Sequence, residues 1–316
     1  MRKWGLAIEL LGIAGVFASF FAGEARHAWF GGGVAAIAAA AAMGAFGERR
    51  TLPQFWLWFA SLAVYAFLYI PLAIVVIFSF NDSKLNAEWV GFTLDWYQHL
   101  AGNESMLTAG NSLAIALVAA AVATVLGTMA GIAMHRFRPR LLPFLVFTPV
   151  AMPEILLGVS LLIFFLNALR PALAIAGLGF DLGLVTVVIA HITFCVGFVA
   201  VIVRARLAGM DESIFEAARD LGATPWQTFR LITLPLIMPG IVAGALMAFT
   251  LSIDDFVITF FTSGVGTKTL PLEIYTMIKV AVTPEVNAVS TLLMLLTLAM
   301  IVIASRVAPD ALKAKA

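Results

Sequence analysis

Long apolar runs separated by short polar segments form the dominant pattern of the chain. A helix needs about 20 apolar residues to cross a hydrocarbon core of about 30 Å. Eight runs approach or exceed this length, near residues 5–22, 29–46, 55–79, 110–134, 143–168, 184–203, 236–256 and 288–305. The pattern therefore predicts an all-α fold, a polytopic membrane helix bundle.

Composition supports the same class of protein. Hydrophobic residues make up 62% of the 316 residues and charged residues 12%, with a mean hydropathy of +1.02. A soluble domain could not hide that much apolar surface from water. The first segment begins MRKW like a secretory signal, but no small-residue cleavage site followed by a polar segment is apparent, so we expect a retained helix.

The placement of basic residues predicts the topology. If the first end is cytoplasmic and the eight spans alternate, inner segments hold 14 of the 19 Lys and Arg residues. The outer segments then hold Arg26, Lys84, Arg170, Lys268 and Lys279. Because cytoplasmic loops carry an excess of Lys and Arg, this bias favours an even number of spans with both termini cytoplasmic.

The first 50 residues differ from the rest. Gly32, Ala36, Ala40 and Gly44 recur every four residues within a segment of very small side chains. This spacing permits close helix packing in lipid, although Ala and Gly are also simply common in such helices. We expect residues 1–50 to form a two-helix membrane extension.

The largest inner loop, at about 205–234, reads LAGMDESIFEAARDLGATPWQTFRLITLP from residue 207. Ser213 and Thr224 are each followed three residues later by Glu or Gln, the spacing of a helix-capping box. Gly222 between them suits a left-handed helix end. The loop is therefore predicted to form two short helices, with the next membrane span starting at Pro235.

The charge of this loop indicates what it binds. The segment DESIFEAARD holds four acidic residues and one basic residue, which argues against nucleic acid. A rigid, capped helix with a narrow alanine face fits a groove in a cytoplasmic protein partner instead.

Carboxylates inside apolar runs are costly in lipid and therefore mark candidate functional residues. Asp254 and Asp255 lie in AFTLSIDDFVITFF, toward the outer end of the seventh run. Adjacent helical residues point about 100° apart, so at most one faces a central pathway; the pair could also lie solvated at the interface and close the helix. Glu154 lies in TPVAMPEILLG, where it lines the pathway or satisfies backbone groups freed by Pro149 and Pro153.

Other polar residues indicate neither a metal site nor catalysis. His191 and Cys195 are four residues apart on one helical face, but two ligands are too few for a closed metal site, so we expect a packed polar pair. The segment SGVGTKT lacks the phosphate-binding loop pattern because Thr267 separates Gly266 from Lys268. No catalytic triad or paired-carboxylate spacing is present, and the chain is not expected to be an enzyme or to bind ATP itself.

The inner loop resembles the EAA loop of permease subunits of ABC importers, which follows E-A-A-x3-G-x9-I-x-L-P. The match is carried by Glu216, Ala217, Ala218, Gly222, Ile232, Leu234 and Pro235. In that family the motif forms a coupling helix that sits in a cleft of the ATPase subunit. The resemblance implies that Glu216, Ala217, Ala218 and Gly222 couple this chain to an ATPase.

Further segments resemble the second permease subunit of spermidine/putrescine importers. They are SFNDSKL, GFTLDWY, HITFC, LSIDDF, LPLEIYTMIKV and TPEVNA, within residues 55–305. The resemblance implies a six-helix permease domain over 51–316, which imports polyamines across the bacterial inner membrane by alternating access. The two extra N-terminal helices fall outside it.

The same resemblance implies the partners. They are a dimer of ATPase subunits that binds ATP and Mg, a second homologous permease, and a periplasmic or extracellular polyamine-binding protein. No cofactor is expected in this chain.

Two alternatives remain at this stage. The same machine could carry another small solute, such as another organic cation, an amino acid derivative or an iron complex. The chain could also be an ion-driven carrier or a membrane scaffold, for which inverted repeats would be the signature, and none is visible.

Overall fold

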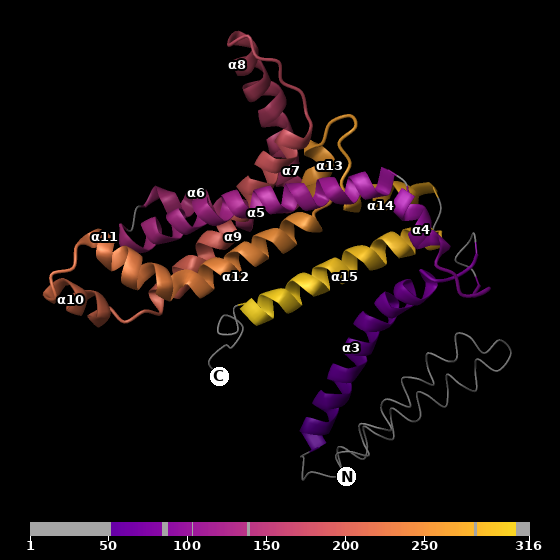
Figure 1. The fold of residues 1–316 in the computed structure, drawn as a ribbon, viewed down its shortest axis with the longest axis horizontal. Helices are drawn as coiled ribbons and strands as arrows, with labels where there is room; N and C mark the ends of the chain where they lie inside the picture. Colours follow the sequence, from indigo (N-terminus) through magenta and orange to yellow (C-terminus); the bar gives the residue numbers. More distant parts are fainter. Residues whose placement is uncertain (1–51, 84–87, 103, 138–139, 281–282, 308–316) are drawn as a thin grey trace. The chain divides into compact units, whose positions relative to one another are not determined.

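The computed structural model describes residues 52–83, 88–102, 104–137, 140–280 and 283–307, and these ranges are helical with short connections (Figure 1). Within them no strand forms, and one isolated bridge joins Asn81 and Phe92. The all-α prediction is thereby confirmed. The expected spans at 5–22 and 29–46, and the small-residue series between Gly32 and Gly44, lie outside the described residues.

The helices follow one another in a fixed order. They are α3 (Leu52–Phe78), α4 (Asp95–Gly102), α5 (Glu104–Arg136), α6 (Leu141–Ala151), α7 (Glu154–Phe164), η2 (Phe165–Leu169), α8 (Arg170–Ile175), α9 (Leu184–Ala208), α10 (Ser213–Asp220), α11 (Pro225–Thr228), η3 (Phe229–Thr233), α12 (Leu234–Ile253), α13 (Val257–Thr262), α14 (Leu270–Val280) and α15 (Pro284–Val307). The chain divides into two units, one running to Tyr97 and including 281–288, the other comprising 98–280 and 289–316.

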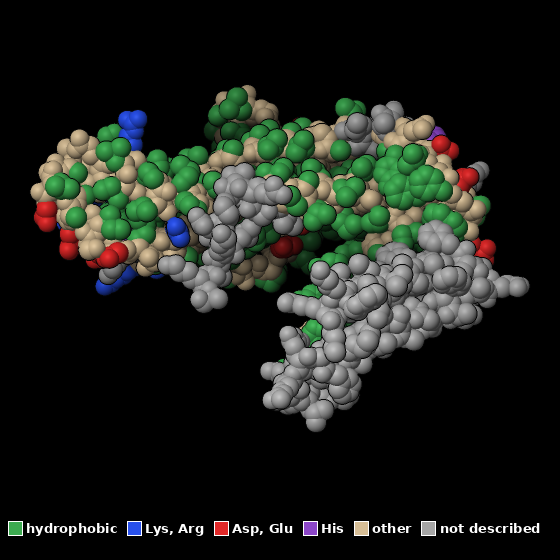
Figure 2. Space-filling view, turned by 60° about the horizontal axis from the view of Figure 1, so that its bottom comes forward, with side chains coloured by type: hydrophobic (Ala, Val, Ile, Leu, Met, Phe, Trp, Pro, Cys, Tyr) green, Lys and Arg blue, Asp and Glu red, His purple; other side chains and the backbone are tan. Residues whose placement is uncertain are grey.

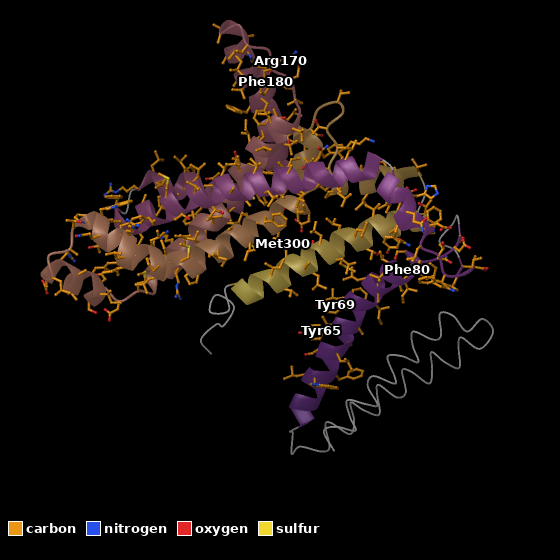
Figure 3. All side chains as sticks on the ribbon, viewed as in Figure 1. Tyr65, Tyr69, Phe80, Arg170, Phe180 and Met300 are labelled. Carbon is orange, nitrogen blue, oxygen red and sulfur yellow. The ribbon has the colours of Figure 1, made fainter. Side chains whose placement is uncertain are left out.

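In the first unit, the loop after α3 is organised by the buried amide of Asn81. Its side-chain nitrogen donates to the Glu88 carbonyl at 2.7 Å, and its side-chain oxygen accepts from the Val90 amide at 2.8 Å. The apolar helix itself is largely exposed, and Tyr65 and Tyr69 project from it one turn apart (Figure 3). Such a surface suits lipid or another protein.

The second unit is built on α5, α9 and α12, which pack against one another. Small residues permit the close approach: a Cβ on Gly131 of α5 would lie 2.9 Å from the Ala200 carbonyl of α9. One turn earlier on α9, a Cβ on Gly197 would overlap Val150 and lie 2.7 Å from the Val146 carbonyl of α6. Backbones that approach this closely gain dispersion contacts, which stabilise helix pairs in lipid.

This packing gives a first prediction. Gly197→Ala forces α6 away from α9, and overpacking of this kind costs about 1–3 kcal/mol. We expect a lower unfolding temperature for the purified protein in detergent, followed by fluorescence-detected size-exclusion chromatography after heating. Gly110→Ala on α5 is the matched control, because its Cβ would meet nothing within 4 Å. Equal stability of the two variants would contradict the packing.

Among the described residues, five helices are long and apolar enough to cross a membrane, namely Leu57–Phe78, Leu107–Arg136, Glu154–Ile175, Leu184–Ala208 and Pro225–Ile253. A shorter apolar stretch, Pro284–Met300, lies where the run 288–305 predicted the last span. The six runs predicted from residue 55 onward thus all correspond to helices. For two of these runs, the boundaries of the helices differ from the expected ones.

The run 143–168 is the first correction, because it is not one helix. Met152 is extended (ψ 141°) and its neighbour Pro153 (ψ 136°) ends α6 and begins α7, since proline disfavours helical geometry in the residue before it. The long apolar helix is Glu154–Ile175. Its residues Leu157 and Phe165 are buried in the core that α5, α9 and α12 share, whereas its α8 end projects away from them in Figure 1. The segment after α8 returns beside the helix, where Phe180 packs on Phe165 and Asp181 pairs with Arg170 at 3.7 Å (Figure 3).

The expected start of the seventh span at Pro235 is also wrong. The helix runs without interruption from Pro225 to Ile253, and residues 229–233 form a turn of π-helix within it. A proline lacks the amide proton of a regular helical turn, and widening the turn just before Pro235 accommodates that loss. The second short helix of the inner loop is therefore rigidly continuous with a membrane span.

The opposite end of the second unit is tied together by polar contacts. The Leu270 amide donates to the Ser112 hydroxyl at 2.6 Å, which links the start of α14 to α5. The Thr186 hydroxyl of α9 donates to the Thr262 carbonyl at the end of α13 at 2.7 Å. These bonds fix the segment in which α12 gives way to α13.

Candidate functional site

The inner loop forms a compact turn between α10 and α11. Gly222 has φ +77°, its amide donates to the Arg219 carbonyl, and the Ala223 amide reaches back to Ala218 at 3.0 Å. These two bonds form a Schellman motif, which places a glycine in the left-handed region to close a helix. The prediction for Gly222 is confirmed.

The start of α11 also follows its prediction. The Gln227 amide donates to the Thr224 hydroxyl at 3.3 Å, and the Gln227 side chain accepts from the Thr224 amide at 2.8 Å. The reciprocal capping box satisfies two amides that the helix leaves without partners.

The predicted cap at Ser213 is wrong, because Ser213 already lies within α10. Its amide donates to the Asp211 carboxylate at 2.9 Å, so the acceptor comes from two residues earlier. The Ser213 backbone, and then its side chain, hydrogen-bonds this carboxylate and holds the pKa of Asp211 below its usual range. An aspartate and a serine both serve this role, and their spacing does not show which will act.

The motif residues point in different directions from α10. Glu216 and Ala217 are exposed, whereas Ala218 is 5% exposed and packs into the chain. Leu221 and Trp226, which the motif does not mark, are 88% and 66% exposed. Large apolar side chains exposed on a rigid polar loop indicate a contact surface, and only the structure distinguishes them from core residues.

This loop lies where charged side chains gather. Figure 2 shows Lys, Arg, Asp and Glu at the end of the second unit that holds α10 and α11, with hydrophobic side chains over much of the face beside it. A cavity of about 680 Å³ lies between the loop and the inner ends of α5 and α9. Its lining includes Arg136, Phe215, Arg219 and Thr228. One connection of the loop to the bundle is the continuous helix from α11 to α12.

At the other end of α12, the two aspartates occupy a break between helices. The α12 helix ends at Ile253 and α13 begins at Val257. Asp254 is exposed and Asp255 is buried. The two side chains therefore point in different directions, as expected, and Asp254 is the one exposed at the protein surface.

Asp255 is fully engaged within the chain. One carboxylate oxygen accepts from the Ile258 amide at 3.3 Å, and the other from the Thr259 amide at 2.9 Å. His191 of α9 lies 3.3 Å from the second oxygen. Asp255 therefore caps α13 and pairs with a histidine, and it has little remaining capacity to bind a substrate.

The pairing of His191 differs in part from the expectation. His191 and Cys195 are both buried, as expected of a packed pair, but their polar contacts lie elsewhere. His191 contacts Ser252, Thr259 and Asp255, and the Cys195 thiol donates to the Ala248 carbonyl at 3.4 Å. Spacing along a sequence reveals neighbours on one helix only, so it could not show that His191 contacts Asp255, which lies 64 positions later. In the part of the chain that is described, no three His, Cys, Asp or Glu side chains group as metal ligands would.

Glu154 joins this region from another helix. It is exposed in the first turn of α7, and Gly158 lies four residues later on the same helical face. A Cβ on Gly158 would lie 2.8 Å from the Phe261 ring of α13, so that face packs on α13. Glu154 therefore lies at the start of the helix that packs on α13, the element that directly follows Asp254 and Asp255.

Two permeases of known systems are similar to this chain in sequence. The chain is 42% identical over 255 residues to the spermidine/putrescine transport system permease protein PotC of Escherichia coli (strain K12), covering 79% of this chain and 93% of that protein. It is 45% identical over 235 residues to the putrescine transport system permease protein PotI of the same organism, covering 73% and 82%.

Solved structures share the fold. A bacterial ABC transporter involved in the import of the acidic polysaccharide alginate aligns with a TM-score of 0.65 at 18% identity, over 83% of this chain and 98% of that one. An inward-facing MetNI methionine ABC transporter aligns with a TM-score of 0.55 at 22% identity, over 67% and 100%.

A family model also matches directly. Residues 123–314, which include α9 to α15 and the inner loop, match the model described as binding-protein-dependent transport system inner membrane component. With the relatives above, this match decides the family. The chain is a multi-pass inner-membrane permease and belongs to the binding-protein-dependent transport system inner membrane components.

Proposed function

We propose that the chain is the permease subunit that moves polyamines through the membrane. The observation that carries this proposal is the exposed carboxylate of Asp254, held at the break before α13, in a chain whose relatives are named as spermidine and putrescine permeases. A polyamine is a polycation, and its charges are costly to carry through a low dielectric without compensation. Carboxylates along its route supply that compensation.

The pathway side of the proposal rests on Asp254 and Glu154. Both side chains are exposed and come from different helices, whereas Asp255 is enclosed by α9 and α13. Two carboxylates on separate elements can approach or separate as the helices rock. The ammonium groups would meet them one after another.

The coupling side of the proposal rests on α10. Glu216 and Ala217 would contact a cytoplasmic ATPase, together with the exposed Leu221 and Trp226. Ala218 faces the chain, so its small size would let α10 lie close to the bundle. Because α11 continues through η3 into α12, a push on α10 would move the helix that ends at Asp254.

The proposal includes the partners and the orientation. An ATPase dimer would bind ATP and Mg on the cytoplasmic side, a second permease would complete the pathway, and a periplasmic or extracellular polyamine-binding protein would deliver the substrate. The exposed apolar surface of the helix Glu154–Ile175, whose α8 end projects away from α5, α9 and α12, suits a permease partner or lipid. Both termini would lie in the cytoplasm, as the basic residues predict.

Cysteine accessibility tests the pathway. The only native cysteine, Cys195, is buried, so thiol reagents should leave the parent protein unmodified. In the assembled transporter in membrane vesicles, Asp254→Cys should react at least about tenfold faster than Asp255→Cys, a free-energy difference of about 1.4 kcal/mol. Spermidine delivered by the binding protein should slow the reaction at residue 254.

Asp181→Cys provides the matched control. Asp181 is an exposed carboxylate in the segment after α8, where it pairs with Arg170, and spermidine should not protect it. Protection at 181 but not at 254 would contradict the proposed pathway.

A further inference from the structure

His191 joins both sides of the break between α12 and α13. Its Nδ1 lies 2.7 Å from the Ser252 hydroxyl, two residues before Asp254. Its Nε2 lies 2.9 Å from the Thr259 hydroxyl, in the first turn of α13. One buried imidazole on α9 therefore contacts the helix that ends before the aspartates and the helix that begins after them.

The directions of these hydrogen bonds can be worked out. The Thr259 hydroxyl donates its one proton to the Asp255 carboxylate at 3.0 Å. Its oxygen must then accept from His191, so Nε2 carries a proton. The same Nε2 lies 3.3 Å from the Asp255 carboxylate. The imidazole thus points a donor toward Asp255, whether or not Nδ1 is also protonated.

The network determines where the two aspartates lie. Asp255 accepts from two amides and a hydroxyl of α13 and faces His191, and its side chain is only 3% exposed. Asp254 shares none of these contacts and is exposed. A buried ion pair is not a strong source of stability by itself, since apolar residues of the same size hold helices equally well. Its hydrogen-bond geometry can instead select one arrangement of neighbouring groups.

We propose that His191 is a positioning residue for translocation, which holds the Asp255 carboxylate against the first turn of α13 so that Asp254 alone offers a carboxylate to the cationic substrate. This inference rests on the proposed function of Asp254. Without the imidazole, the Asp255 carboxylate lacks its only partner outside α13 among the described contacts. It is then expected to turn toward water and add a second negative charge beside residue 254.

The charge at residue 254 can be measured with thiol reagents of opposite sign. In an Asp254→Cys transporter, the modification rates by trimethylammonium-ethyl and sulfonato-ethyl methanethiosulfonate give a cation-to-anion ratio. His191→Ala should raise this ratio about fivefold, because an added nearby charge acts on the two reagents in opposite directions. The same change combined with Asp255→Asn should return the ratio to the starting value or below.

Two conservative variants separate positioning from packing. Gln can place its amide nitrogen near the position of Nε2, whereas Asn reaches only the position of Nδ1. We therefore expect His191→Gln to keep the parent ratio and His191→Asn to behave like His191→Ala. Thr193→Val is the matched control, because Thr193 lies half-buried on the same helix and its hydroxyl donates to the Ile189 carbonyl of its own helix at 2.8 Å.

The outcomes distinguish this inference from the proposed function. If Asp254→Cys is unreactive or is not protected by spermidine, the pathway proposal fails. If it reacts and is protected, but Asn and Gln at 191 give the same ratio, the positioning role fails. A raised ratio that persists when Asp255 is Asn would also overturn it, because the added charge would then come from another group.

Discussion

Asp254→Lys is expected to reduce polyamine uptake by the assembled transporter at least about a hundredfold. The physical reason is charge: at an effective dielectric constant of about 20, two unit charges 4 Å apart interact by about 4 kcal/mol. Replacing attraction by repulsion at one point of the route therefore affects transport more than most single changes. Asp254→Asn removes only the attraction, and we expect a loss of about tenfold. Uptake of radiolabelled spermidine into vesicles at matched protein levels gives both values.

The charge of the substrate provides an internal control. Spermidine carries one more positive charge than putrescine, so Asp254→Lys should depress its uptake more. Asp181→Asn should leave uptake unchanged, because exposed ion pairs such as Arg170–Asp181 contribute little. Normal spermidine uptake by a stably inserted Asp254→Lys protein would contradict the proposed pathway. It would indicate that the permease does not recognise the charge of its solute.

The aspartate pair shows what sequence reasoning could and could not predict at this site. Apolar periodicity locates the helix, and an acidic pair within it is an evident anomaly. Which residue faces outward depends on the helix ending at Ile253 rather than near residue 256, and on His191 of another helix. Contacts between residues 64 positions apart leave no periodic signal in a single sequence.

The helix boundaries give the same lesson. The six apolar runs from residue 55 onward correspond to helices because burial in lipid requires length and apolarity, both of which a sequence displays directly. Two prolines had opposite effects that the sequence does not separate. Pro153 ends a helix, whereas Pro235 lies inside a continuous one because the preceding turn widens into a π-helix. Local geometry decided each case.

Gly222→Val is expected to uncouple transport from ATP hydrolysis, with uptake reduced about tenfold or more while membrane insertion stays normal. Gly222 adopts φ +77°, a conformation that costs other residues roughly 1–2 kcal/mol and β-branched residues more. If the backbone at residue 222 relaxes to avoid this cost, the hydrogen bonds that close α10 break and the exposed face of α10 changes direction. Uptake and ATPase activity measured on the same reconstituted transporter would show ATP consumed with little substrate moved.

Gly222→Asn separates backbone conformation from crowding. A Cβ at this position would meet nothing within 4 Å, so the left-handed backbone conformation, rather than a clash of the Cβ, restricts the choice of residue. Asparagine tolerates the left-handed region better than other residues with a Cβ, and we expect it to retain most of the coupling. If Val and Asn both transport like the parent, force does not pass through a rigidly held α10. If both fail equally, a contact made by the glycine backbone itself, rather than its conformation, accounts for the loss.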